Sequence, residues 1–181
     1  QQIGGTCIEL AAAGDGIALD FGLPLDGDAT DTSLVPEIAG DDLRGIVISH
    51  PHIDHYGLLH HLSGSTPVAM GSAARRIVQA AAPFTGQPLP SLNGPDLEHG
   101  KAIEIGAFRI TPYLVDHSAY DAYSFLIEAE GKRIFYSGDF RAHGRKANLY
   151  EHLVANPPKD IDALFMEGSS LSRLESDSSF P

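Results

Sequence analysis

Short apolar runs, separated by turns rich in glycine and proline, make up most of the chain. Runs of about four to eight apolar or alternating residues between such turns predict β-strands. The turns at 13–16 and 130–131 contain glycine and predict tight hairpins. We expect strands at residues 3–10, 16–21, 45–48, 66–70, 102–105, 108–115, 123–129, 133–136 and 161–166, the third and the last of them buried.

Helical spacing predicts helices at residues 54–62, 72–82 and 145–155. Asp54 and Ser72 are placed to cap the first two, because a side-chain oxygen at a helix start accepts hydrogen bonds from the free N–H groups. Pro83 is expected to end the second helix, since proline lacks the N–H that a helix needs. Asn156 and the two prolines after it are expected to end the third.

The order of these elements defines the fold class. Strands, then a strand–helix alternation, then further strands and helices predict an α/β or α+β protein with two sheets packed face to face and helices outside. The acidic stretch 23–43 predicts an exposed loop with room for a short helix, and 83–100 a second loop. At 181 residues, of which 43% are hydrophobic, one domain is expected.

The residues with the clearest chemistry directly follow the buried strand at 45–48. They read Ser49-His50-Pro51-His52-Ile53-Asp54-His55. Imidazole and carboxylate groups are the ligands that divalent metals such as zinc prefer. The alternative is a polar surface loop that happens to be rich in histidine. The spacing favours a metal site and allows two ions, with His50 and His52 facing one and Asp54 and His55 the other.

Two further potential ligands lie at the ends of predicted strands. His117 follows Val115-Asp116, and Asp139 follows Ser137-Gly138. Each is unremarkable alone, but together with the first cluster they complete a ligand set. Gly138 leaves room beside Asp139, where a side chain would crowd a metal centre. The remaining histidines at 60, 61 and 99 are expected to be surface residues rather than ligands.

The cluster from His50 to His55 resembles the signature of the metallo-β-lactamase-fold hydrolases. The stretches 137–141 and 165–170, together with Asp116-His117-Ser118, resemble the β-CASP branch, which contains RNase J and nucleases of RNA 3′-end processing and DNA repair. The resemblance implies an αββα sandwich over residues 1–168, incomplete at its C-terminal side. It also implies that 169–181 is a linker or the start of a truncated β-CASP insertion.

The resemblance also implies a ligand set. His50, His52 and His117 would hold one divalent ion, Asp54 and His55 a second, and Asp139 would bridge both. Zinc is the first choice and manganese the alternative. Asp20 would be a supporting residue that orients the histidine loop, whereas spacing alone favours a residue that starts a turn. The last metal-ligand histidine of the family lies beyond the insertion, and the spacing of His143 and His152 does not recommend either as a substitute.

The implied activity is metal-dependent phosphodiester hydrolysis, most plausibly by a ribonuclease of RNA processing or decay that uses a hydroxide held between two metals. Asp54 would orient or deprotonate the nucleophile, and Glu167 would take part in proton transfer. Ser118, Arg141, His143 and Arg145 would contact the substrate, its phosphates above all. The alternative for the last three is a solvated basic loop.

Composition qualifies this activity. The formal net charge of −12 argues against unaided binding to nucleic acid, although five of the 12 Lys and Arg residues fall within 132–146. Two divalent ions would add about +4 at the site. A small-molecule hydrolase acting on a thioester, lactone or lactam is therefore a second hypothesis, and a non-catalytic scaffold a third. We expect single-stranded RNA as substrate, a cytoplasmic location and no membrane association, with a homodimer left open. The single cysteine, Cys7, is expected to be a buried reduced thiol.

Overall fold

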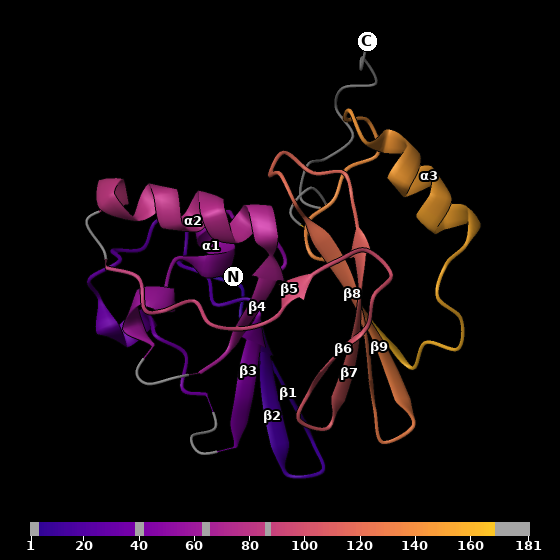
Figure 1. The fold of residues 1–181 in the computed structure, drawn as a ribbon, viewed down its shortest axis with the longest axis horizontal. Helices are drawn as coiled ribbons and strands as arrows, with labels where there is room; N and C mark the ends of the chain where they lie inside the picture. The colour runs from indigo at the N-terminus through magenta and orange to yellow at the C-terminus, as the bar shows by residue number, and fades with distance from the viewer. Residues whose placement is uncertain (1–3, 39–41, 63–65, 86–87, 169–181) are drawn as a thin grey trace.

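Two five-stranded sheets face each other across the core of the protein (Figure 1). The computed structural model describes residues 4–38, 42–62, 66–85 and 88–168. The predicted stretch 169–181 and residue 3 of the first predicted strand lie outside this range. None of the described helices is long and apolar enough to cross a membrane.

The first sheet has the order β1-β2-β3-β4-β5 and is built mainly from parallel pairs. The hairpin of β1 and β2 is antiparallel, with Ile8 opposite Leu19, and confirms the predicted turn at 13–16. The short β5 was not predicted, because it lies in the stretch that proline and glycine mark as a loop. The strands are β1 (Ile8–Ala12), β2 (Asp15–Leu19), β3 (Leu43–Val47), β4 (Val68–Gly71) and β5 (Asp96–Leu97).

The second sheet has the order β10-β9-β8-β7-β6 and is antiparallel except at its β10 edge. Glu130 and Gly131 both have positive φ, 48° and 73°, and form the predicted tight turn between β8 and β9. The strands are β6 (Ile103–Ile105), β7 (Phe108–Leu114), β8 (Tyr123–Ala129), β9 (Lys132–Tyr136) and β10 (Ala163–Phe165).

Helices flank the two sheets on opposite sides (Figure 1). Helices α1 (Ile53–Tyr56) and α2 (Ser72–Thr85) lie beside the first sheet, and α3 (Ala147–Ala155) lies beside the second. Two single 3-10 turns, η1 (Thr32–Leu34) and η2 (Leu59–His61), complete the described elements. The helix–sheet–sheet–helix arrangement confirms the predicted fold.

Alternation along the strands explains the layers. Ile17 and Leu19 of β2 belong to the cluster between the sheets, whereas Ala18 belongs to the cluster on the helix side of the first sheet. In β3, Val47 faces the second sheet and Ile46 faces α2 in the same way. Successive side chains of a strand point to opposite faces, so the apolar end of β3, residues 45–47, is buried on both faces. The ends of these strands are therefore held rigidly.

The first two helices differ from their predicted forms. The helix expected at 54–62 is split into α1 and η2 around Gly57, and His52 rather than Asp54 is its N-cap residue, without a side-chain cap bond. Helix α2 continues to Thr85 with Pro83 inside it. Pro83 removes one N–H donor from the last turn, and only two residues of the helix follow it, so the loss stays confined to that end. The prediction that Pro83 ends α2 was wrong.

The N-terminus of α2 is capped from a distant part of the chain. The carboxylate of Asp121, rather than the hydroxyl of Ser72, accepts hydrogen bonds from the N–H groups of Ala73 (2.9 Å) and Ala74 (3.0 Å). A carboxylate at this end of a helix also interacts favourably with the helix dipole. Local sequence could not reveal this contact, which ties α2 to the loop between β7 and β8.

The last strand is not buried as predicted. β10 forms an edge of its sheet, and the side chain of Leu164 is 56% exposed. A cavity of about 620 Å³ lies between α3 and the outer face of this sheet and is lined mainly by apolar side chains, including Phe135, Tyr150 and Leu153. An apolar edge strand and a buried central strand have the same sequence pattern, because the pattern does not show whether other strands pack on both sides.

The three histidines that were expected at the surface all make hydrogen bonds to the backbone. His60 and His61 are part-buried, and the Nε2 atom of each lies 2.8 Å from the carbonyl oxygen of Ala29, so they fasten the acidic loop. His99 is exposed, and its Nδ1 accepts from the backbone N–H of Leu114 (3.0 Å).

Cys7 is half-buried. Its burial, with Asp20 and Glu9, raises the pKa of its thiol to about 11, which keeps it protonated.

Arg75 of α2 is predicted to be the most important surface-facing residue for stability. Its guanidinium donates to the carbonyl oxygens of Leu92, Val68, Gly94 and Pro95 and pairs with Asp96. Arg75→Ala should remove these hydrogen bonds and lower the free energy of unfolding by about 2–3 kcal/mol, measured by urea denaturation. The neighbouring exposed Arg76→Ala, as a control, should change it by less than about 0.5 kcal/mol. An equal effect of both would contradict this role.

Candidate metal centre

The predicted ligands converge at one end of the two sheets. His50 and His52 follow β3, His117 follows β7 and Asp139 follows β9. The N–H of Tyr123 donates to the carbonyl oxygen of Ser49 (2.9 Å) and joins the sheets beside these ligands. The ends of β3, β7 and β9 thus position loops from both sheets around one point. The structure brings together His50, His52, His55, His117 and Asp139, and Asp54 lies beside them.

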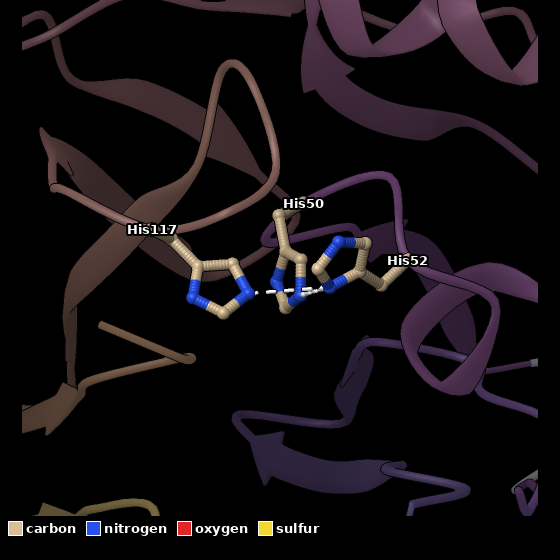
Figure 2. A group of neighbouring side chains, drawn as sticks. All are labelled: His50, His52 and His117. Carbon is tan, nitrogen blue, oxygen red and sulfur yellow. Dashed lines mark hydrogen bonds between the residues drawn. The ribbon is translucent and has the colours of Figure 1, made fainter. Parts of the chain in front are cut away.

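Three imidazole rings form the first group (Figure 2). The Nδ1 atom of His52 lies 3.2 Å from the Nε2 atom of His50 and 3.2 Å from the Nε2 atom of His117. Ligand nitrogens on a tetrahedral zinc ion, each about 2.0–2.1 Å from the metal, lie about 3.3–3.4 Å apart. Two of the three nitrogen–nitrogen distances therefore match a tetrahedral zinc site, and the ligand atoms of all three residues lie within 4.8 Å of one another.

A second group shares one residue with the first. The ligand atoms of His50, His55 and Asp139 lie within 4.8 Å of one another. Asp54, predicted as a ligand beside His55, is close but outside this group, with its Oδ2 3.8 Å from the Nε2 of His55. The structure thus places His50 at the junction of both groups, which spacing along the chain did not indicate.

Asp139 lies between the two groups. Its Oδ1 is 3.5 Å from the Nε2 of His55, and its Oδ2 is 4.0 Å from the Nε2 of His117. One carboxylate thus presents an oxygen to each group, the orientation that a bridging ligand requires. Gly138, with φ of 53°, precedes it; a Cβ there would lie 2.9 Å from the carbonyl oxygen of Tyr123 and 3.2 Å from the Cβ of Ser49. Glycine is needed because of these neighbours rather than because of the ligands.

Asp20 is fully buried beneath the histidines and accepts four hydrogen bonds. Its Oδ1 accepts from the N–H of Ser49 (2.6 Å), and its Oδ2 accepts from the Oγ of Ser49 (2.8 Å), the Nδ1 of His55 (2.8 Å) and the hydroxyl of Tyr136 (2.6 Å). A carboxylate has about four acceptor positions, so all are used. Asp20 is therefore a support for the ligand loop and not a turn starter. Sequence reasoning missed Ser49 and Tyr136, whose partners are far apart in the chain.

This network also fixes the tautomers of two histidines. The Nδ1–H of His55 donates to Asp20, so Nε2 is the nitrogen that faces Asp139. The Ser49 hydroxyl donates to Asp20 and can therefore accept from the Nδ1–H of His50 (3.0 Å). The Nε2 lone pair of His50 then faces His52. A hydrogen bond on the far nitrogen is how proteins commonly orient metal-binding imidazoles.

Burial and neighbouring charges prepare these groups as donors. Burial, followed by the nearby His55, lowers the pKa of His50 to about 2, and burial lowers that of His117 to about 4. Burial opposes ionisation of Asp139, but the hydrogen bond and charge of His55 outweigh it and lower the pKa to about 2. At neutral pH His50 and His117 are therefore neutral imidazoles and Asp139 is an ionised carboxylate, the forms that bind metal.

His55 is in a different electrostatic environment. Burial lowers the pKa of its imidazole, but Asp20 and then Asp139 raise it by more, to about 10. Without a metal ion, these carboxylates hold a proton on the ring. The same negative charge attracts a metal cation, which takes the place of that proton.

A cavity of about 290 Å³ opens beside the second group. Its lining includes Asp54, His55, Asp139 and Glu167, so the two predicted catalytic carboxylates face the same space. The N–H of Glu167 donates to the Oγ of Ser137 (3.1 Å), which fixes the backbone at the end of β10. Burial, followed by the charge of Asp139, raises the pKa of Glu167, which favours its protonated form.

The residues predicted to contact substrate have different environments. Ser118, His143 and Arg145 are exposed. Arg141 is half-buried, and its guanidinium lies on the carboxylate of Asp116, with Nε 3.4 Å from Oδ1. The sequence did not indicate this pair, since a single Asp before a ligand histidine has no distinctive pattern. Arg141 is thus already partnered.

The fold and the metal-binding groups define a family. The model of the Beta-lactamase superfamily domain matches residues 28–178, and the chain belongs to this superfamily. The predicted resemblance to the metallo-β-lactamase-fold hydrolases is confirmed. Membership and the two His/Asp groups together support a metal-binding hydrolase.

Two curated proteins and one solved structure are similar to the chain over most of its length. The transcription termination factor FttA of Methanothermobacter thermautotrophicus is 25% identical over 194 residues, which is 93% of this chain and 30% of that protein. RNase aCSPSF2 of Saccharolobus solfataricus is 23% identical over 190 residues, 93% of this chain and 37% of that protein. A crystal structure of a protein of unknown function from Enterococcus faecalis V583 has a TM-score of 0.82 and 25% identity, over 98% of this chain and 50% of that one.

These shares state how much of each relative the chain represents. It spans about a third of the length of the two curated relatives and half of the Enterococcus faecalis chain. The match to an N-terminal part of a longer enzyme, inferred from the sequence, is consistent with these shares. Similarity to a protein named as an RNase agrees with the β-CASP branch of the resemblance.

Proposed function

We propose that the protein is a metal-dependent phosphodiester hydrolase that cleaves single-stranded RNA. The observation that carries this proposal is the position of Asp139, whose two oxygens face His55 and His117 of the two ligand groups. His50, His52 and His117 would hold one ion, and His55 with Asp139 would hold the second, with Asp54 nearby. Two divalent ions at these positions would act as Lewis acids and make water a better nucleophile at neutral pH.

Zinc is the proposed metal, because the two 3.2 Å distances between imidazole nitrogens suit a tetrahedral ion. Manganese is the alternative, favoured only by the carboxylates. His50 belongs to both groups of the structure, so its nitrogen would be available to one ion at a time. The second ion is therefore expected to bind more weakly than the first.

The chain's own residues supply the proton transfers. Asp54 lines the cavity beside His55 and would orient the attacking water or accept its proton. Glu167 lines the same cavity, and its raised pKa suits a group that gives a proton to the leaving oxygen. Ser118, Arg141, His143 and Arg145 stay proposed substrate contacts. The exposed positions of Ser118, His143 and Arg145 are accessible to a phosphate, whereas Arg141 would need to share its guanidinium with Asp116.

RNA is the proposed substrate because the relatives include an RNase and a transcription termination factor, and because the Gly138-Asp139-Phe140-Arg141 context resembles β-CASP nucleases. We propose residues 1–168 as the metal-binding domain and 169–181 as a linker or the start of an insertion. The cytoplasmic location and the homodimer stay predictions.

A small-molecule hydrolase is the second candidate, favoured by the net charge of −12 and by the superfamily itself. A scaffold without catalysis is the third candidate. It ranks last because both ligand groups are complete enough to bind metal, which a scaffold does not need. The candidates differ in what the metal-loaded protein should turn over. The first candidate should cleave a phosphodiester, the second should turn over a lactam or thioester, and the third should do neither.

The test is cleavage of end-labelled single-stranded RNA by the zinc-loaded protein, followed on a denaturing gel, beside turnover of a chromogenic lactam and a thioester. We expect RNA cleavage that a chelator stops and that His52→Ala reduces by about a thousandfold or more. His152→Ala, which changes an exposed histidine of α3, is the matched control and should cleave like the unmodified protein. Turnover of the lactam or thioester with intact RNA would overturn the proposal in favour of the second candidate.

A further inference from the structure

Two ligand-bearing loops are fastened to each other beside the metal centre. The N–H of Arg141 donates to the carbonyl oxygen of Asp116 (2.8 Å), and its guanidinium contacts the Asp116 carboxylate, which is 1% exposed. Asp116 directly precedes His117, and Arg141 lies two residues after Asp139. This buried ion pair fixes the segment 141–146 relative to the loop that follows β7.

Gly144 brings that segment onto the same carboxylate. A Cβ at Gly144 would collide with the Oδ2 of Asp116 and with the Arg141 guanidinium, so only glycine permits this approach. The segment therefore crosses directly over the buried carboxylate. The next residues of this segment are the cations Arg145 and Lys146.

Lys146 lies against an exposed aromatic ring. Its Nζ is 5.7 Å from the centroid of the Tyr120 ring, within the range of a cation–π contact. Tyr120 is 69% exposed, although both neighbours are fixed: Ala119 is buried, and the Asp121 carboxylate accepts from Ala73, Ala74 and the Tyr123 hydroxyl. The backbone of Tyr120 is thus held while its ring faces solvent.

Other cations of this region are already paired with carboxylates. Lys132 pairs with Asp162 (2.8 Å), and Arg133 pairs with Glu128 (3.1 Å). Arg141 pairs with Asp116. The basic cluster that the sequence shows at 132–146 therefore reduces to a smaller surface at Arg145 and Lys146, beside Tyr120.

We infer that Tyr120 and Lys146 form a platform on which single-stranded RNA lies beside the metal centre, a base stacking on Tyr120 and a phosphate meeting Lys146. This inference rests on the proposed function. Tyr120 is three residues after the ligand His117, which is about 10–11 Å of extended chain at most. A lone exposed tyrosine needs no explanation. A fixed backbone, an adjacent cation and proximity to the ligands together match the stacking-plus-cation surfaces that bind single strands.

The test measures binding of a fluorescein-labelled single-stranded RNA by the zinc-loaded protein, with fluorescence anisotropy read before any cleavage is detectable on a denaturing gel. A second oligonucleotide carries abasic sites in place of the bases. Tyr120→Ala should weaken binding of the base-containing RNA about tenfold to a hundredfold and leave the abasic strand unaffected. Tyr120→Phe should bind both like the unmodified protein. Lys146→Gln should lower the slope of log affinity against log salt by about 0.7, one phosphate contact on a single strand.

Phe84→Ala is the matched control, because Phe84 is an aromatic residue of α2 that is 91% exposed. It should change neither binding nor the salt slope. Equal loss by Tyr120→Ala on both oligonucleotides would mean a structural role and overturn the platform. If the unmodified protein binds and cleaves RNA and Tyr120→Ala does so equally well, the platform is wrong and the proposed function stands. If the unmodified protein neither binds nor cleaves RNA, both fail.

Discussion

Replacing His50 with alanine is expected to remove metal from both groups and to lower hydrolytic activity by about a thousandfold or more. His50 is the one residue common to the two ligand groups. Metal ions contribute several kcal/mol of transition-state stabilisation, and each 1.36 kcal/mol is a factor of ten in rate. The measurement is the number of zinc ions per chain by elemental analysis, together with the rate of RNA cleavage.

His52→Ala is the comparison for this variant. His52 belongs only to the three-histidine group, so His52→Ala should lose the first ion and leave His50, His55 and Asp139 able to hold another. His50→Ala should therefore bind clearly less zinc than His52→Ala. Equal zinc content in the two variants would show that His50 does not serve both groups.

Asp20→Asn is expected to have the largest effect on stability. Asparagine tolerates the positive φ of 61° at this position, so the variant changes the chemistry and not the backbone. Its NH2 group would meet donors where the carboxylate accepts four hydrogen bonds. We expect the free energy of unfolding of the metal-free protein to fall by about 3–5 kcal/mol, measured by urea denaturation.

The same variant should weaken zinc binding about tenfold to a hundredfold, measured by competition with a chromophoric chelator, because His50 and His55 would lose the partners that orient them. Tyr136→Phe removes only one of the four hydrogen bonds to Asp20 and is the matched control. It should lower the free energy of unfolding by about 1–2 kcal/mol and leave zinc affinity nearly unchanged. Asp20→Asn with unchanged stability and affinity would contradict the supporting role.

Local pattern was enough to predict most of the strands and the cluster of potential ligands that follows β3. The apolar run at the end of β3 and the histidines that follow it are contiguous in the chain, so their structure and chemistry can be inferred together. The strands before His117 and Asp139 were found in the same way. The convergence of these ligands from two sheets came from the resemblance, because separation along the chain does not define distance in space.

What was missed depends on contacts between distant segments. Asp121 caps α2 from a position 47 residues further along the chain than Ala74. Asp116 contacts Arg141, which lies 25 residues after it. A carboxylate before a histidine or in a turn looks the same in sequence whether it is solvated or buried against a cation. The burial of β10 was overestimated for a related reason, since an edge strand and a central strand can have the same apolar residues.

The most direct test of the metal centre is anomalous diffraction at the zinc edge from crystals of the zinc-loaded protein. The account predicts one strong peak at bonding distance from His50, His52 and His117, and a second, weaker peak beside His55 and Asp139. A single peak at the three histidines would keep the first site and remove the shared two-metal centre. Zinc at other residues, such as the pair His60 and His61, with none at His50, would contradict the account.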